Sequence, residues 1–189
     1  MSDTYLNRTF GTATARNKFT LSVWLKRGKV DNNAYHFFFS SYASNSDRMG
    51  CYFNTGDTLD FYGVSYHVAT NRKFRDPAAW YHVVYKVDTT QATASDRVKI
   101  YVNGQLETDL GQNTYPAQND NLGYGTSSYN LYIGNYEGSN YFYNGSMSHM
   151  HFCDGYAYEP TEFGETDGTT GEWKIKTSPS VSYGTNGFF

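Results

Sequence analysis

Carboxylate pairs are the first residues to consider as catalysts, because glycoside hydrolysis uses two carboxyl groups that face one sugar bond. Glutamate and aspartate stand two positions apart at 107–109 and again at 165–167, which places both side chains on one face of a strand. Neither strand carries a second glutamate that could serve with the first as nucleophile and acid/base, since the next glutamates are Glu137 and, beyond the glycine-rich GTTG, Glu172. We therefore predict no catalytic residues and no enzymatic activity.

Histidines and cysteines are the next groups that could do chemistry. His149 and His151, at i and i+2, could present two imidazoles to a metal ion, but no third ligand follows at a spacing typical of a metal site. His82 lies inside an apolar run, and we predict a hydrogen-bonded, structural role for it. Cys51 and Cys153 stand far apart in two apparent strands and are predicted to be free, buried thiols.

Tyrosine and asparagine gather in two loop-like stretches, 42–48 and 135–141. Aromatic rings stack on the apolar faces of sugars, while Asn, Asp and Ser supply directional hydrogen bonds, so both stretches are candidates for glycan binding. The 19 tyrosines could instead serve cross-strand packing or contacts between subunits, and their number does not separate these roles. The candidate glycan-binding residues are Tyr42, Asn45, Asp47, Arg48, Tyr124, Tyr136, Asn140 and Tyr141.

Alternating apolar and polar residues predict the antiparallel strands that position these side chains. In KFTLSVWLKR, residues 18–27, the alternation places one apolar set in a core and Trp24 on the opposite face. The pair Asn103-Gly104 predicts a type I′ hairpin turn, because both central residues of that turn need positive φ. Further strands are predicted at about 4–10, 34–42, 48–55, 57–64, 79–88, 96–104, 129–136 and 142–155.

Two of these strands are predicted to supply much of the core. The expected core residues are Trp80, Val83, Val84, Tyr85, Val98, Ile100 and Val102. Residues 111–128 contain few β-branched residues and are predicted to form a long loop over one end of the sandwich. The sequence EPTEFGE, residues 159–165, predicts a single helical turn beginning at Pro160, and residues from about 166 to 189 are expected to form an irregular last edge.

Composition favours a single all-β domain over residues 1–189, a two-sheet antiparallel jelly-roll sandwich, since glycine and aromatic residues are abundant and strong helix formers scarce. The net charge of −3 and the scattered basic residues give no expectation of a nucleic-acid partner. No apolar run approaches the roughly 20 residues that span a bilayer. The start MSDTYLNRTF lacks the order of a signal peptide, so we expect neither membrane insertion nor export by the usual route.

Three segments, in this order, resemble the laminin-G-like jelly-roll domains of the concanavalin A-like lectin/glucanase superfamily. They are FTLSVWLKR, then WYHVVYKVDTT with VKIYVNG, then FYNGSMSHMHFCDGYAYEPTEFGE with its trailing GEWKIK and YGTNGFF. More narrowly, they are similar to the domains of tail-fibre and other virion proteins of tailed phages, especially marine ones. Glucanases of the superfamily carry two glutamates flanking an aspartate on one strand, a pattern that this chain lacks.

The resemblance implies a virion surface protein, either a fibre or a capsid decoration, that is assembled in the host cytoplasm and involved in host attachment. It further implies a homo-oligomer, a trimer in the case of a fibre, with other virion proteins and a host-surface glycan as partners. A purely structural decoration or docking protein is the alternative. Related phage domains usually run on past the segment that ends this chain at Phe188-Phe189, which leaves open how the last edge is paired.

The resemblance also bears on cofactors. Many laminin-G-like domains hold a calcium ion at the rim of the sandwich through carboxylate and carbonyl oxygens, the ligands that a hard cation prefers. The candidate ligands here are Asp47, Asp120 and Asp154. No other cofactor is expected.

Overall fold

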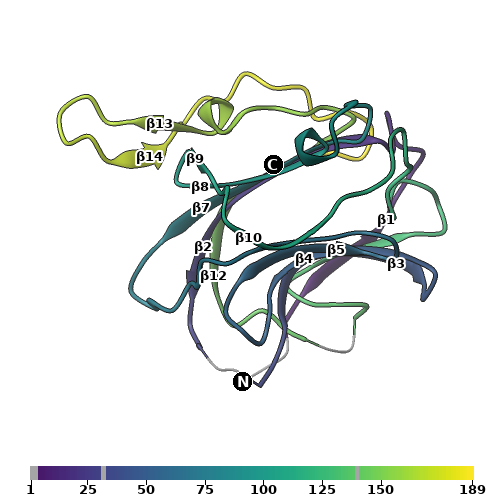
Figure 1. Cartoon of the computed structure of the whole chain (residues 1–189), viewed down its shortest axis with the longest axis horizontal. Helices are drawn as coiled ribbons and strands as arrows, with labels where there is room; N and C mark the ends of the chain where they lie inside the picture. Colours follow the sequence, from purple (N-terminus) through teal and green to yellow (C-terminus); the bar gives the residue numbers. More distant parts are fainter. Residues whose placement is uncertain (1–3, 31–32, 139–140) are drawn as a thin grey trace.

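Two antiparallel β-sheets packed face to face form the body of the protein in a computed structural model, which describes residues 4–30, 33–138 and 141–189. Figure 1 shows the two layers, with β3, β4 and β5 in one and β2, β7, β8 and β12 in the other. The only helical elements among the described residues are two short 3₁₀ turns, η1 (Ala94–Asp96) and η2 (Pro160–Glu162). The prediction of an all-β jelly-roll sandwich is confirmed.

The larger sheet has seven strands in the order β1-β11-β3-β4-β5-β6-β10. Their bounds are β1 (Leu6–Thr9), β3 (His36–Ser44), β4 (Asp47–Phe53), β5 (Leu59–Gly63), β6 (His67–Thr70), β10 (Leu110–Thr114) and β11 (Asn130–Ile133). Strands β6 and β10 pair with each other, so the predicted loop over 111–128 is wrong at its start. That error arose because LGQNT is polar and exposed, as suits the edge of a sheet.

The smaller sheet has five strands in the order β12-β2-β7-β8-β9. Their bounds are β2 (Lys18–Arg27), β7 (Tyr81–Asp88), β8 (Val98–Val102), β9 (Gln105–Leu106) and β12 (Gly145–Asp154). The predicted hairpin joins β8 to β9, with Asn103 at φ 50° and Gly104 at φ 77°. The predicted helical turn is also present, as η2.

The core lies between the two sheets. Phe19, Leu21, Val23 and Leu25 of β2 are fully buried there, and each stabilises the fold by about 1.5–3 kcal/mol through removal of apolar surface from water. Val83, Tyr85, Val98, Ile100 and Val102 are in the core as predicted, while Val84 is buried outside that cluster. Trp80 contradicts its prediction, because it precedes β7 and leaves 41 % of its surface exposed.

The segment from 155 to 189, here named the C-terminal cover, lies across the outer face of the five-stranded sheet. It contains the two-stranded hairpin of β13 (Gly164–Thr166) and β14 (Trp173–Ile175), which extends past β8 and β9 in Figure 1. Further on, Phe188 forms an antiparallel bridge with Phe152 of β12. The outer-face residues Ser22 and His82 are therefore fully buried. No helix in the described part of the chain is long and apolar enough to cross a membrane.

Candidate functional site

A cleft of about 420 Å³ opens on the outer face of the seven-stranded sheet, the face that the C-terminal cover does not reach. Strands β3 to β6 and the segments beside β3 and β11 supply its walls. The lining residues are Tyr35, Phe37, Arg48, Tyr52, Tyr62, His67, Tyr136 and Tyr141. Six of these eight side chains are aromatic hydrocarbon or phenol rings, and none is a carboxylate.

The floor of the cleft is a stacked pair of rings. Phe37 lies 4.2 Å from Tyr52, with an angle of 21° between the ring planes. The pairing of β3 with β4 is irregular between Phe37 and Phe39, so that Phe38 and Phe39 both enter the core while Phe37 faces outward. A side chain at Gly50 would place its Cβ 2.3 Å from the Phe37 ring, so glycine is needed beneath the stack.

One wall is formed by the segment that follows β11. The Tyr136 ring lies 4.8 Å from Phe37, and Tyr141 meets Tyr35 edge to face at 5.2 Å. Glu137 and Tyr141 both adopt left-handed backbone conformations, at φ 48° and 55°, which costs a bulky residue about 1–2 kcal/mol. The amide of Phe37 donates to the carbonyl of Tyr141 and so fixes this segment to β3. Such backbone strain is concentrated at functional sites in proteins.

Arg48 provides the positive charge of the cleft. Its Nη2 donates to the Tyr62 hydroxyl at 2.9 Å, and its Nη1 donates to Oδ1 of Asn45 at 2.9 Å. The hydroxyl of Tyr42 lies 3.4 Å from the same Asn45 oxygen. The hydrogen bond with Tyr62 raises the pKa of Arg48, which therefore stays cationic.

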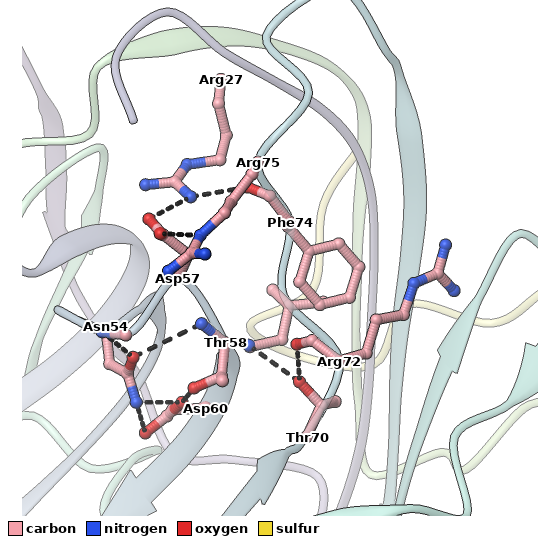
Figure 2. A network of polar contacts seen from close by, with 11 residues as sticks. Arg27, Asn54, Asp57, Thr58, Asp60, Thr70, Arg72, Phe74 and Arg75 are labelled. Carbon is pink, nitrogen blue, oxygen red and sulfur yellow. Dashed lines mark hydrogen bonds and ion pairs between the residues drawn. The ribbon is translucent and has the colours of Figure 1, made fainter. Parts of the chain in front are cut away.

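His67 and the buried Asp60 form the opposite polar end. Nε2 of His67 donates to Asp60 at 2.7 Å, and Figure 2 shows Asn54 and Thr58 converging on the same carboxylate. Burial raises the pKa of the Tyr52 phenol, and the nearby Asp60 charge raises it further. Tyr52 is therefore a hydrogen-bond donor at neutral pH.

A second part of the network in Figure 2 supports the loop that leads into β5. Arg27 donates from Nη1 to Asp57 at 2.8 Å and to the carbonyl of Phe74 at 2.7 Å, and Arg75 donates from Nε to the other Asp57 oxygen at 2.8 Å. Burial alone would raise the pKa of Asp57, but the hydrogen bonds from Arg75 and Arg27 outweigh it and lower the pKa. This cluster holds the loop and does not line the cleft.

The structure brings five of the predicted glycan-binding residues together. Arg48, Tyr136 and Tyr141 line the cleft. Tyr42 packs on Tyr136 at 5.9 Å, and Asn45 contacts both Tyr42 and Arg48. The two stretches singled out in the sequence thus meet at one place, because β3 pairs with both β4 and β11.

The structure does not place the other three candidate glycan-binding residues in this group. Tyr124 is fully buried, with its hydroxyl bonded to the carbonyls of Ala15 and Lys18, so its assignment to a glycan site is wrong. Asp47 accepts a hydrogen bond from Tyr129 and lies 4.0 Å from Arg16, away from the cleft. Asn140 lies outside the described residues.

The three calcium candidates do not gather at one point. Arg16 donates to the carbonyls of Leu122 and Tyr124 and faces Asp47, so a guanidinium takes the oxygen atoms that a cation would need there. Asp154 is buried and accepts from the Asn186 amide, and Asp120 lies in the loop after β10. Within the described ranges, no three His, Cys, Asp or Glu side chains are placed to hold a metal ion.

The histidines of β12 singled out in the sequence have structural partners, and the two cysteines are buried. His149 has a φ of 47° at an irregularity of β12, and both it and His151 pack against Phe189. Burial lowers the pKa of His151 to about 4. Cys51 and Cys153 are both free and buried.

The two carboxylate pairs also have structural partners. Glu107 pairs with Arg72, and Asp109 accepts from Asn71. Glu165 and Asp167 both lie within ion-pair distance of Lys174, which belongs to the hairpin of the C-terminal cover. None of these four carboxylates lines the cleft.

Five lining residues of the cleft were not predicted from the sequence. They are Tyr35, Phe37, Tyr52, Tyr62 and His67. A signal was available for Tyr52, which stands at i+4 from Arg48 and therefore shares its face of β4. No comparable signal existed for Phe37, because the irregularity that turns it outward is a property of strand pairing.

A known protein family matches most of the chain. Residues 2–162 match the laminin G family described as the concanavalin A-like lectin/glucanases superfamily. No curated protein matches the chain. The matched region ends at η2, before most of the C-terminal cover.

Several solved structures share the fold at low sequence identity. A CBM40 domain of the Ruminococcus gnavus IT-sialidase is 17 % identical with a TM-score of 0.55, over 85 % of this chain and 96 % of that one. Domain 4 of the Geobacillus stearothermophilus arabinanase AbnA, in complex with arabinotriose, is 16 % identical with a TM-score of 0.55, over 78 % and 65 %. A heptameric SAP-like pentraxin from Limulus polyphemus is 17 % identical with a TM-score of 0.50, over 78 % and 68 %.

Proposed function

The chain belongs to the concanavalin A-like lectin/glucanases superfamily, and on that premise we propose that it is a non-enzymatic carbohydrate-binding domain. The observation that carries the proposal is the aromatic cleft on the open face of the seven-stranded sheet. Its volume of about 420 Å³ suits a small ligand, and its rings offer flat apolar surfaces on which sugars stack. The CBM40 domain, which has been solved with α2,3-sialyllactose, and the arabinotriose-bound arabinanase domain support this class of ligand.

The absence of a catalytic pair from the cleft supports the non-enzymatic half of the proposal. Among the described residues, the cleft lining contains no carboxylate, whereas glycoside hydrolysis by the usual route needs two. The buried Asp60, which is bonded to the lining residue His67, also accepts hydrogen bonds from Asn54 and Thr58. We propose that the ligand is held and released unchanged.

The experiment is glycan binding by variants with single ring deletions. Tyr141→Ala and Tyr35→Ala remove rings that are 45 % and 38 % exposed, so the fold should survive both changes. We expect about tenfold weaker binding, equivalent to ~1.4 kcal/mol, in glycan-array titration or calorimetry. Tyr156→Ala is the matched control, because Tyr156 is 37 % exposed on the C-terminal cover. Equal effects of all three variants would overturn the placement of the ligand in the cleft.

The biological setting is a further part of the proposal. We propose that residues 1–189 act as one domain on the surface of a tailed-phage virion, assembled in the host cytoplasm, where the cleft attaches the particle to a host glycan. The resemblance of the three segments to virion domains supports this setting. A single shallow site binds weakly, so attachment requires several copies acting together, which raises avidity by roughly 10²- to 10⁴-fold.

A structural docking role is the second candidate, and an exposed apolar patch favours it. Leu6 and Phe189 are 68 % and 74 % exposed, and they line one hollow together with Ile133, Met147 and Phe188. This patch lies beside β1, an edge strand whose four residues are all exposed. We propose that a second copy of the chain covers it in a homo-oligomer. Light scattering of the wild type and of Leu6→Glu tests this proposal. A monomeric wild type would contradict the homo-oligomer and would leave the glycan proposal standing.

A further inference from the structure

The permanently charged residue in the lining of the cleft is an arginine. This residue is Arg48, and no Asp or Glu lines the cleft. The carboxylate of Asp60 lies behind the lining, because the side chain is only 1 % exposed and accepts hydrogen bonds from His67, Asn54 and Thr58, so it presents no oxygen to a ligand. The lining of the cleft therefore offers a ligand a guanidinium and no carboxylate.

In the described part of the chain, four arginines form ion pairs with carboxylates, and Arg48 does not. Arg16, Arg27, Arg72 and Arg75 each lie within 4.0 Å of an Asp or Glu oxygen. Across the described ranges, Arg48 has no such partner, and its side-chain hydrogen bonds go to neutral groups such as those of Asn45 and Tyr62. Its Nε is buried and meets no acceptor within the described residues. An unpaired guanidinium in a partly buried site is a ready partner for a planar anion.

We propose that the cleft selects an acidic glycan, whose carboxylate or sulfate group pairs with Arg48 while a sugar ring stacks on the aromatic floor. This inference rests on the proposed function and adds the chemical class of the ligand. The protein as a whole carries a net charge of −3, so a general basic surface does not account for such a preference. Recognition is assigned to one guanidinium next to rings that supply the contact area.

The probes are oligosaccharides in matched acidic and neutral forms. One pair is a uronic-acid oligosaccharide and its methyl ester, and the other is a sulfated oligosaccharide and its desulfated form. Each pair keeps the sugar rings and changes only the charge. We expect the wild-type protein to bind at least one acidic form ten or more times more tightly than its neutral partner, and we expect this difference to shrink at high salt.

Three variants separate charge recognition from ring stacking. Arg48→Gln should abolish the acidic preference, Arg48→Lys should retain part of it, and Tyr141→Ala should weaken acidic and neutral forms alike. Arg72→Gln is the matched control, since it removes a positive charge that is paired with Glu107 outside the cleft. Circular dichroism of each variant checks that the fold is retained.

The outcomes distinguish this inference from the proposed function. Equal binding of acidic and neutral forms, or a preference that Arg48→Gln leaves unchanged, would overturn the inference while the carbohydrate-binding function stands. Failure of every glycan to bind the wild-type protein would overturn both. A preference that Arg72→Gln removes as completely as Arg48→Gln would show a diffuse charge effect and would also overturn the inference.

Discussion

The indole Nε1 of Trp173 donates a 2.8 Å hydrogen bond to Nδ1 of His82, which fixes the C-terminal cover to the five-stranded sheet. Since Nδ1 accepts this bond, the ring proton resides on Nε2, which donates to the Ser22 hydroxyl at 2.8 Å. His82 is also stacked on Trp24, with the ring centroids 5.0 Å apart, and its ring lies at 20° to the hydrogen-bonded indole of Trp173. Burial lowers the pKa of His82 to about 3, so the imidazole stays neutral at physiological pH.

The first prediction is a loss of stability in mild acid. Because the folded-state pKa values of His82 and His151, about 3 and about 4, lie below the ordinary 6.5, the unfolded chain takes up protons first as pH falls. The stability from the neutral rings is complete above pH 6.5 and declines below it. We expect about 2 kcal/mol less free energy of unfolding per histidine at pH 5 than at pH 7.5, measured by urea denaturation.

His82→Gln is the control for that measurement, because its amide can replace both an acceptor and a donor but does not titrate. It should flatten about half of the pH dependence. The buried carboxyl group of Asp57, whose pKa is lowered, contributes only in stronger acid and does not interfere. A wild-type protein that is equally stable at pH 7.5 and pH 5 would contradict the assignment.

The second prediction concerns the hydrogen bond itself. Trp173→Phe keeps an aromatic ring beside His82 but leaves the buried Nδ1 without its donor, which should cost about 1–3 kcal/mol. Trp80→Phe is the comparison, since Trp80 is 41 % exposed and should change stability by less than about 0.5 kcal/mol. Chemical denaturation of both variants provides the test, and a Trp173→Phe variant as stable as Trp80→Phe would rule out an anchoring role for this bond.

The third prediction compares the loss of the buried carboxylate of Asp57 with the loss of its exposed partner Arg75. Asp57→Asn leaves the cation of Arg27, which is only 1 % exposed, without its counter-ion and should destabilise the fold by about 3–5 kcal/mol. The side chain of Arg75 is 52 % exposed, so Arg75→Gln should cost less than about 1 kcal/mol. Thermal unfolding of the two variants should give this order, and the reverse order would refute the electrostatic account of the loop.

The fourth prediction tests the floor of the cleft. In Gly50→Ala the new Cβ would lie 2.3 Å from Cε1 of Phe37, so the ring must leave its stack on Tyr52. We expect a loss of about 1–3 kcal/mol in stability together with weaker glycan binding. Gly168→Ala is the matched control, because a Cβ there meets nothing within 4 Å. Unchanged glycan binding by Gly50→Ala would show that the ligand does not use this floor.

The fifth prediction concerns the thiols. Burial raises the pKa of both Cys51 and Cys153, and the thiolate is the reactive species. Native protein should therefore react with a water-soluble disulfide reagent orders of magnitude more slowly than the unfolded chain, which should show two thiols. Rapid labelling of the native protein at neutral pH would contradict the buried positions of these residues.

The sequence predicted the fold more completely than the cleft, and strand pairing explains the difference. Alternation along β2 and the Asn103-Gly104 turn depend on local residue order, so both could be predicted directly. The position of Phe37 depends on an irregular register between β3 and β4, and Tyr124 faces the core because Arg16 holds its loop there. Tyr136 and Tyr141 could be chosen by composition, but their meeting with Arg48 required the non-local pairing of β3.

The rings of the cleft contact one another before any ligand arrives. Phe37 touches Tyr52, Tyr136 and Tyr141, and Tyr141 also meets Tyr35. A site built in this way is preorganised, so that association need not immobilise side chains at about 0.5–1.5 kcal/mol each. Affinity for a rigid sugar is then limited by the contacts it makes and by the water it displaces, and the release rate becomes the quantity that substitutions at these rings would change.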